Sequence, residues 1–95
     1  MSPKLDGHSI RACVDSYRYP DGCNEAGRKH AANMFCQYKG YSRATQWQWQ
    51  TTPKGRPRRK KRVWEWTEQY QDGYLKRSYT WKGKKRRYFT TIECS

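Results

Sequence analysis

Aliphatic side chains are scarce in this sequence, in which leucine, isoleucine and valine each occur only twice. A domain of 95 residues buries a modest fraction of its surface, so its core must draw on other residue types. Apolar runs are also short, and none approaches the roughly 18 residues that a membrane-spanning helix requires. We therefore expect no transmembrane segment.

The first 13 residues lack the apolar core of a secretory signal. We expect either an intracellular chain or a mature segment from which a signal has been removed. Sequence alone leaves both alternatives open.

Acidic residues are few, since eight Asp and Glu stand against 21 Lys and Arg, for a formal net charge of +13. Such a charge opposes compaction and attracts polyanions such as nucleic acid, acidic glycans or anionic microbial surfaces. The sequence therefore predicts a protein that binds polyanions.

Catalytic signals are equally sparse. There are two histidines, and no nucleophile motif such as GxSxG occurs. We expect His30 to face solvent, although a small basic nuclease that uses it is an alternative. The sequence thus predicts a non-enzymatic protein without a cofactor or metal.

Cysteines and aromatic residues are well represented. Fifteen aromatic side chains, including five Trp, must supply most of the core. The four cysteines favour two disulfides and an oxidising compartment, and they allow three pairings. Free buried thiols are one alternative. A zinc site is another, although zinc ligands usually come in closely spaced pairs; its ligands would be Cys13, Cys23, His30 and Cys36.

Periodicity divides the chain into a flexible leader over residues 1–12 and a single small domain over 13–95. Residues 24–41 carry helix signals, with Asn24 as the N-cap and Gly40 at the C-terminal end. An apolar stripe at helical spacing supports this helix. It consists of Ala31, Met34, Phe35 and Tyr38.

After Gly40 the apolar period changes to two, which predicts strands. These strands span residues 43–51, 62–70, 74–81 and 86–94. We expect an α+β fold in which one helix packs on a four-stranded antiparallel meander, stabilised by disulfides. Pairing of the first two strands would set Trp47 opposite Trp66 and Trp49 opposite Trp64. We interpret these rings as core, with a ligand-stacking surface as the alternative.

A meander would place a basic hairpin loop at residues 53–62 and the basic turn at 82–87 at one end of the sheet. Two converging basic runs predict a binding surface for phosphate or sulfate groups. Its basic residues are Lys54, Arg56, Arg58, Arg59, Lys60, Lys61, Arg62, Lys82, Lys84, Lys85, Arg86 and Arg87. The aromatic neighbours that we expect are Tyr74, Tyr79 and Trp81.

Residues 52–62, TPKGRPRRKKR, resemble an AT-hook, whose core is a Gly-Arg-Pro tripeptide flanked by basic residues. The resemblance implies that Arg56 enters an A·T minor groove, that Lys54 flanks it and that residues 58–62 contact phosphates. The same run is typical of a nuclear localisation signal. These features favour an intracellular DNA- or RNA-binding protein as the alternative function.

A second resemblance covers more of the chain. Residues 23–47 and the final Ile-x-Cys resemble a family of small secreted domains from plants and cyanobacteria, which carry an Ala-Ala-x-x-Phe-Cys-x-x-x-Gly-Tyr motif. The matching residues are Ala31, Ala32, Phe35, Cys36, Gly40, Tyr41, Ala44, Ile92 and Cys94.

This resemblance implies an extracellular domain with the disulfides Cys13–Cys23 and Cys36–Cys94. It favours a secreted, non-enzymatic protein that acts on microbial surfaces or acidic glycans, with antimicrobial defence as one such role.

Overall fold

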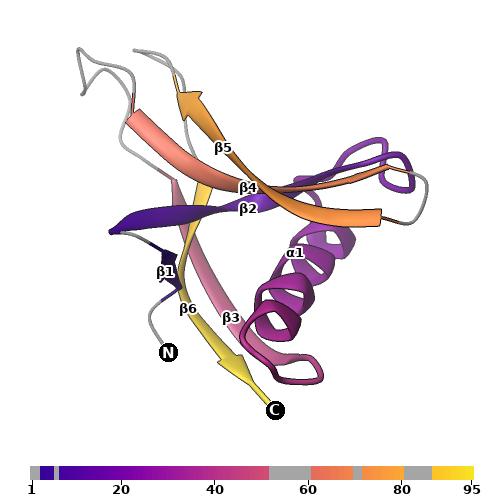
Figure 1. The fold of residues 1–95 in the computed structure, drawn as a ribbon, viewed down its shortest axis with the longest axis vertical. Coiled ribbons are helices and arrows are strands. Elements are labelled where there is room, and N and C mark those ends of the chain that lie inside the picture. The colour runs from indigo at the N-terminus through magenta and orange to yellow at the C-terminus, as the bar shows by residue number, and fades with distance from the viewer. Residues whose placement is uncertain (1–2, 6, 52–60, 70–71, 81–86) are drawn as a thin grey trace.

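The protein is described here by a computed structural model that covers residues 3–5, 7–51, 61–69, 72–80 and 87–95. Within these residues the fold is α+β, with one helix and a mixed six-stranded sheet (Figure 1). The predicted fold class and the single helix are therefore confirmed. The elements are β1 (Lys4–Leu5), β2 (His8–Ser16), α1 (Glu25–Tyr38), β3 (Ala44–Thr51), β4 (Lys61–Gln69), β5 (Asp72–Thr80) and β6 (Arg87–Cys94).

The strand order is β3-β6-β2-β4-β5, with β1 paired to β2 outside this path. Strand β2 runs antiparallel to β6 and parallel to β4, so it joins two antiparallel pairs, β3–β6 and β4–β5. In Figure 1 the β3–β6 pair turns away from the direction of β2, β4 and β5, and α1 lies in the angle between them. No helix within the described ranges has the length and apolar character of a membrane span.

The predicted antiparallel meander is matched only in part: all four of its strands exist, and β4 and β5 form the predicted antiparallel pair, but the other pairings differ. Strand β3 pairs with β6 rather than β4, so Trp47 lies opposite Ile92 and Trp49 lies opposite Phe89. The predicted pairs with Trp66 and Trp64 do not form. The physical reason is that β2 occupies the centre of the sheet, between the strands that a meander would have joined.

Of the flexible leader predicted for residues 1–12, residues 8–12 belong instead to β2, which begins at His8. Ile10, Ala12 and Val14 alternate along this strand and are buried in the core. A chain with so few aliphatic residues must recruit such a segment to exclude water from its interior.

Helix α1 follows its predicted signals. The Asn24 side chain accepts a hydrogen bond from the Gly27 N–H at 2.9 Å, which satisfies one of the free donors of the first turn. At the other end Gly40 adopts a positive φ of 93°, where glycine is favoured, and the Tyr41 N–H returns to the Cys36 carbonyl. Of the predicted apolar stripe, only Tyr38 is exposed.

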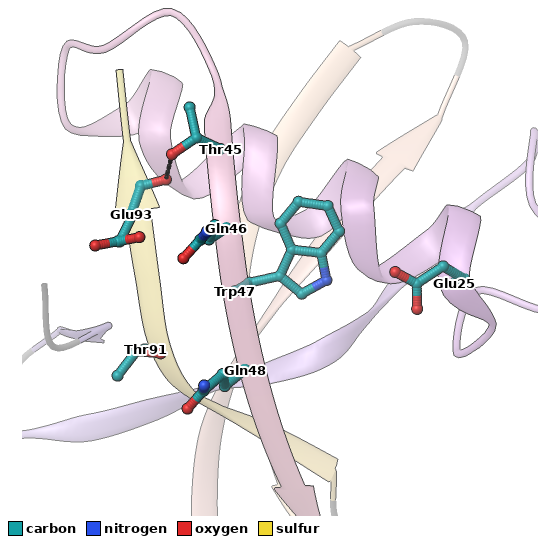
Figure 2. Close-up of a pocket in the computed structure, with 7 residues that line it drawn as sticks. All are labelled: Glu25, Thr45, Gln46, Trp47, Gln48, Thr91 and Glu93. Carbon is teal, nitrogen blue, oxygen red and sulfur yellow. Dashed lines mark hydrogen bonds between the residues drawn. The ribbon is translucent and has the colours of Figure 1, made fainter.

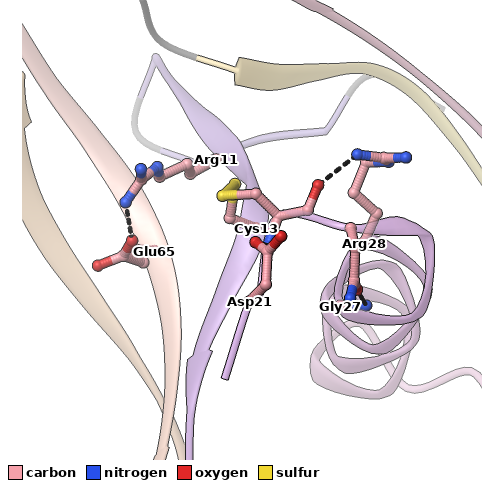
Figure 3. The surroundings of a disulfide bond; sticks show 8 residues. Arg11, Cys13, Asp21, Gly27, Arg28 and Glu65 are labelled. Atoms are coloured by element: carbon pink, nitrogen blue, oxygen red, sulfur yellow. Dashed lines mark hydrogen bonds and ion pairs between the residues drawn. A yellow bond between two sulfur atoms is a disulfide. The ribbon is translucent and has the colours of Figure 1, made fainter. Parts of the chain in front are cut away.

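Two disulfides join distant parts of this frame. Cys36–Cys94 connects α1 to β6, and Cys13–Cys23 connects β2 to the loop before the helix (Figure 3). The two predicted disulfides are confirmed, and they contradict the zinc set because all three of its cysteine sulfurs are engaged in disulfide bonds. The pairs are those that the resemblance to small secreted domains implies.

Close backbone contact explains two glycines near the Cys13–Cys23 disulfide. A Cβ atom on Gly22 would lie 1.7 Å from the Val14 carbonyl oxygen, and one on Gly27 would lie 2.1 Å from the Gly22 oxygen. Only glycine fits both positions without a backbone shift. The first turn of α1 is thereby held against the loop that β2 supports.

Candidate functional site

Four strand ends meet in two pairs at one end of the sheet. Thr51 lies opposite Arg87, and Lys61 lies opposite Thr80. The sequence runs from the first pair to the second through residues 52–60, and it returns from the second pair to the first through residues 81–86. Figure 1 shows all four strand ends on the same, upper side of the molecule.

Strand β2 holds the two pairs of strands beside each other. On one side, Arg11 of β2 lies opposite Tyr88, which is one residue from Arg87. On the other side, Ile10 lies opposite Trp64, which is three residues from Lys61. The expectation that both basic connections start and finish at one end therefore agrees with the pairing of their flanking residues. The expectation assumed that the four strands form a meander. In the structure, the two connections instead pass between strand pairs that lie on either side of β2.

Only part of the predicted binding surface falls in the described residues. Lys61 and Arg62 are the first residues of β4, Arg62 lies opposite Tyr79, and Arg87 is exposed at the start of β6. The remaining predicted residues lie outside the described ranges. They are Lys54, Arg56, Arg58, Arg59, Lys60, Trp81, Lys82, Lys84, Lys85 and Arg86.

Tyr74 is not brought to this end of the sheet, because it pairs with Thr67. Tyr74 precedes Thr80 by six residues, and six residues of extended strand span about 20 Å. It is exposed and lines a cavity of about 470 Å³ whose walls include Tyr38, Trp64 and Trp66.

Charge is distributed unevenly along the sequence. Residues 51–62 and 80–87, which we call the basic end, contain twelve Lys and Arg and no Asp or Glu. The rest of the chain contains nine basic and eight acidic residues. Nearly all of the net charge of +13 therefore belongs to the basic end.

Outside the basic end, several cations take part in holding the fold together. Arg11 pairs with Glu65 across β2 and β4, and the Arg28 guanidinium lies 4.4 Å from the Trp49 ring centre (Figure 3 shows the first pair). Arg28 also donates to the Cys23 carbonyl beside the disulfide. These cations connect elements that are distant in sequence.

A buried carboxylate, Glu68 of β4, forms the centre of a polar cluster. It accepts hydrogen bonds from the Ser16 hydroxyl at 2.9 Å and from the Arg18 guanidinium at 2.6 Å. The His30 Nε2 atom lies 3.2 Å from the same carboxylate. The Arg18 hydrogen bond lowers the pKa of Glu68 below its ordinary value of 4.5, against the opposing effect of burial.

The expectation that His30 faces solvent is wrong, because its side chain is only 20% exposed and its ring packs 5.1 Å from that of Tyr19. Sequence analysis missed the cluster because His30 and Glu68 are 38 residues apart. The Ser16 hydroxyl donates to the carboxylate rather than to the imidazole. The cluster therefore ties β2, α1 and β4 together.

A groove of about 620 Å³ lies along β3 and β6, beside the first turn of α1 (Figure 2). Among its lining residues, Trp47 is the one that sequence analysis considered for a ligand, as a core residue with a ligand-stacking surface as the alternative. The lining residues are Glu25, Thr45, Gln46, Trp47, Gln48, Thr91 and Glu93.

The chain has no match among protein-family models, curated proteins or solved structures. Its functional interpretation therefore rests on the residues and contacts described above.

Proposed function

We propose that this chain is a non-enzymatic module that binds polyanions through its basic end. The observation that carries the proposal is the pairing of Thr51 with Arg87 and of Lys61 with Thr80. Both basic segments are attached to these four residues, which supports the assignment of their twelve cations to one end of the sheet. No acidic residue within residues 51–62 or 80–87 offsets them.

Clustered cations bind polyanions mainly by releasing condensed counterions. Affinity then falls steeply as salt rises, and it depends on where the cations lie as well as on net charge. The ligand that we propose is an acidic glycan or an anionic microbial surface. The two disulfides support this choice because they are typical of oxidising, extracellular compartments. The corresponding role is that of a secreted defence protein.

Nucleic acid is the second candidate, favoured by the sequence Gly55-Arg56-Pro57 within the basic run. An Arg in such a core is suited to the narrow, electronegative minor groove of A·T-rich DNA. A nucleic-acid-binding function of this kind implies that the protein is located in the nucleus.

The test is to replace Arg58, Arg59, Lys60 and Lys61 together with Ser, which lowers the net charge by four. A matched control replaces four exposed cations elsewhere with Ser, for the same change in charge. These are Lys29, Lys39, Arg43 and Lys76. Dissociation constants for heparin and for A·T-rich duplex DNA are measured over a range of NaCl concentrations.

We expect the first variant to lose most of its affinity for whichever polyanion binds. For duplex DNA, the slope of log K against log salt should fall by roughly 3 to 4 if each lost cation contacts a phosphate. The control variant should retain most of its slope. Equal losses in the two variants would show that net charge, rather than the basic end, determines binding. Stronger binding to DNA than to heparin at equal salt would favour the second candidate.

A further inference from the structure

The groove along β3 and β6 differs in chemistry from the basic end. Strand β3 is at the edge of the sheet, so the groove follows an open border of the molecule. Among the residues that the structure describes, its surface consists of one indole ring, two amides, two threonines and two carboxylates, without Lys or Arg.

Strand pairing fixes how these groups are arranged. Gln46 lies opposite Glu93, and Gln48 lies opposite Thr91, so these four side chains share one face of the pair. Figure 2 shows the Trp47 indole on the other side of β3, extending toward Glu25. A ligand that follows this border therefore meets an aromatic ring on one side and polar groups on the other.

The indole is supported by the core. Trp47 packs against the hydrophobic core and is only partly buried. Its neighbour Thr45 donates a hydrogen bond to the Glu93 carbonyl at 3.3 Å, which fixes β3 against β6 beside the groove. A ring supported in this way can bind a ligand without a large loss of side-chain entropy.

The polar groups retain unused hydrogen-bonding capacity. Within the described residues, the side-chain amides of Gln46 and Gln48 have no hydrogen-bond partner. Each amide offers two donor hydrogens and a carbonyl acceptor, and each carboxylate adds acceptors. A hydroxyl group both donates and accepts, so a ligand rich in hydroxyls would satisfy these amides and carboxylates together.

Charge excludes acidic ligands from this groove. Glu25 and Glu93 would repel a sulfated or phosphorylated polymer at short range. Glu25 pairs with Arg28 at 2.9 Å, but its side chain remains 72% exposed. The groove and the basic end therefore favour different ligands.

We infer that the groove binds an uncharged, β-linked polysaccharide of the glucan or chitin type. A pyranose with equatorial hydroxyls has an apolar C–H face that packs on an aromatic ring, and a rim of hydroxyls that pair with amides and carboxylates. Trp47 would receive the C–H face, and Gln46 and Gln48 would bind the hydroxyls. This inference goes beyond the proposed function and does not depend on it.

The test is calorimetric titration with cellohexaose and with N-acetylated chitohexaose in 1 M NaCl. Screening at this salt concentration acts over about 3 Å, which suppresses binding through the basic end. We expect saturable binding of at least one sugar, weakened at least tenfold by Trp47→Ala and at least fivefold by Gln46→Ala with Gln48→Ala. The control is Gln50→Ala, which alters the same residue type on the same strand outside the groove and should leave affinity unchanged.

Because Trp47 contacts the core, the double glutamine variant keeps the test valid if Trp47→Ala does not fold. Absence of saturable binding to either sugar by the native protein would overturn the inference. So would a double glutamine variant that binds as tightly as the native protein, or a Gln50→Ala variant that loses as much affinity. The serine variant of the basic end separates the two proposals, since it should lose heparin binding and retain sugar binding.

Discussion

The basic end and the rest of the molecule use their cations differently. In the rest of the chain, Arg11, Arg18 and Arg28 each contact a carboxylate on another element or another turn. At the basic end, the sequence supplies twelve cations and no carboxylate, and two strand pairings join the residues that flank both basic segments. On the proposed function, charges that stabilise the fold are separated from charges available to a ligand. Each set should therefore be removable without loss of the other.

The largest expected effect comes from breaking the frame at Cys36–Cys94. Replacing both cysteines with Ala should lower the free energy of unfolding by about 4 kcal/mol, because the disulfide closes a loop of 58 residues in the unfolded chain. Urea denaturation measures this loss. Removal of Cys13–Cys23, which spans 10 residues, should have a smaller effect of about 3 kcal/mol. A larger loss from the shorter loop would contradict the chain-entropy explanation.

The next effect comes from Glu68, whose replacement with Gln removes the charge that Arg18 and His30 face. We expect a loss of about 2 kcal/mol at neutral pH, because the buried Ser16 hydroxyl and the Arg18 guanidinium are left with a weaker acceptor. Thermal denaturation at several pH values measures it.

The sign of the pH dependence follows from the lowered pKa of Glu68. Its contribution to stability is fully present above the unfolded value, near 4.5, and is lost as pH falls through the lower folded value. The Glu68→Gln variant and the native protein should therefore converge in stability in acid. The control is Glu93→Gln, which removes one carboxylate charge from an exposed position. Parallel profiles for Glu68→Gln and the native protein would contradict this assignment.

A smaller effect is expected at the start of α1. Asn24→Ala removes the side-chain acceptor of the Gly27 N–H and should lower the free energy of unfolding by about 1 kcal/mol. Asn24→Asp restores an acceptor and should recover most of this loss. Chemical denaturation of the two variants checks the prediction, and a similar loss in both would show that the cap is not the cause.

The smallest effect on stability is expected at the basic end itself. The variant with Ser at positions 58–61 should unfold within about 0.5 kcal/mol of the native protein, and any change at low salt should be stabilising because repulsion is relieved. Denaturation at low and high NaCl measures this difference. A destabilisation of more than about 1 kcal/mol would show that these cations also support the fold.

Local signals in the sequence were sufficient for the helix and for four of the strands. Asn24 and Gly40 mark the two ends of α1 through their own hydrogen bonds and backbone conformation. The strands after Gly40 follow from alternation over a few residues. Each of these features depends on neighbours in the chain, which is why it was predictable.

Strand order depended on contacts that no local pattern contains. Ile10, Ala12 and Val14 already alternate as a strand does, and this was the signal that could have identified β2. Its parallel pairing with β4 joins residues more than 50 positions apart, such as Ile10 and Trp64. The cluster around Glu68 depends on that same pairing, so it was missed as well.

The Cys36–Cys94 disulfide has a consequence for proteolysis. Residues 52–60 and 81–86, rich in the Lys and Arg that trypsin-like proteases recognise, both lie between these two cysteines in the sequence. A single cut in either segment produces two chains that remain one covalent molecule, with Cys36 in one fragment and Cys94 in the other. Such a nicked protein would migrate as one species on a non-reducing gel and as two after reduction.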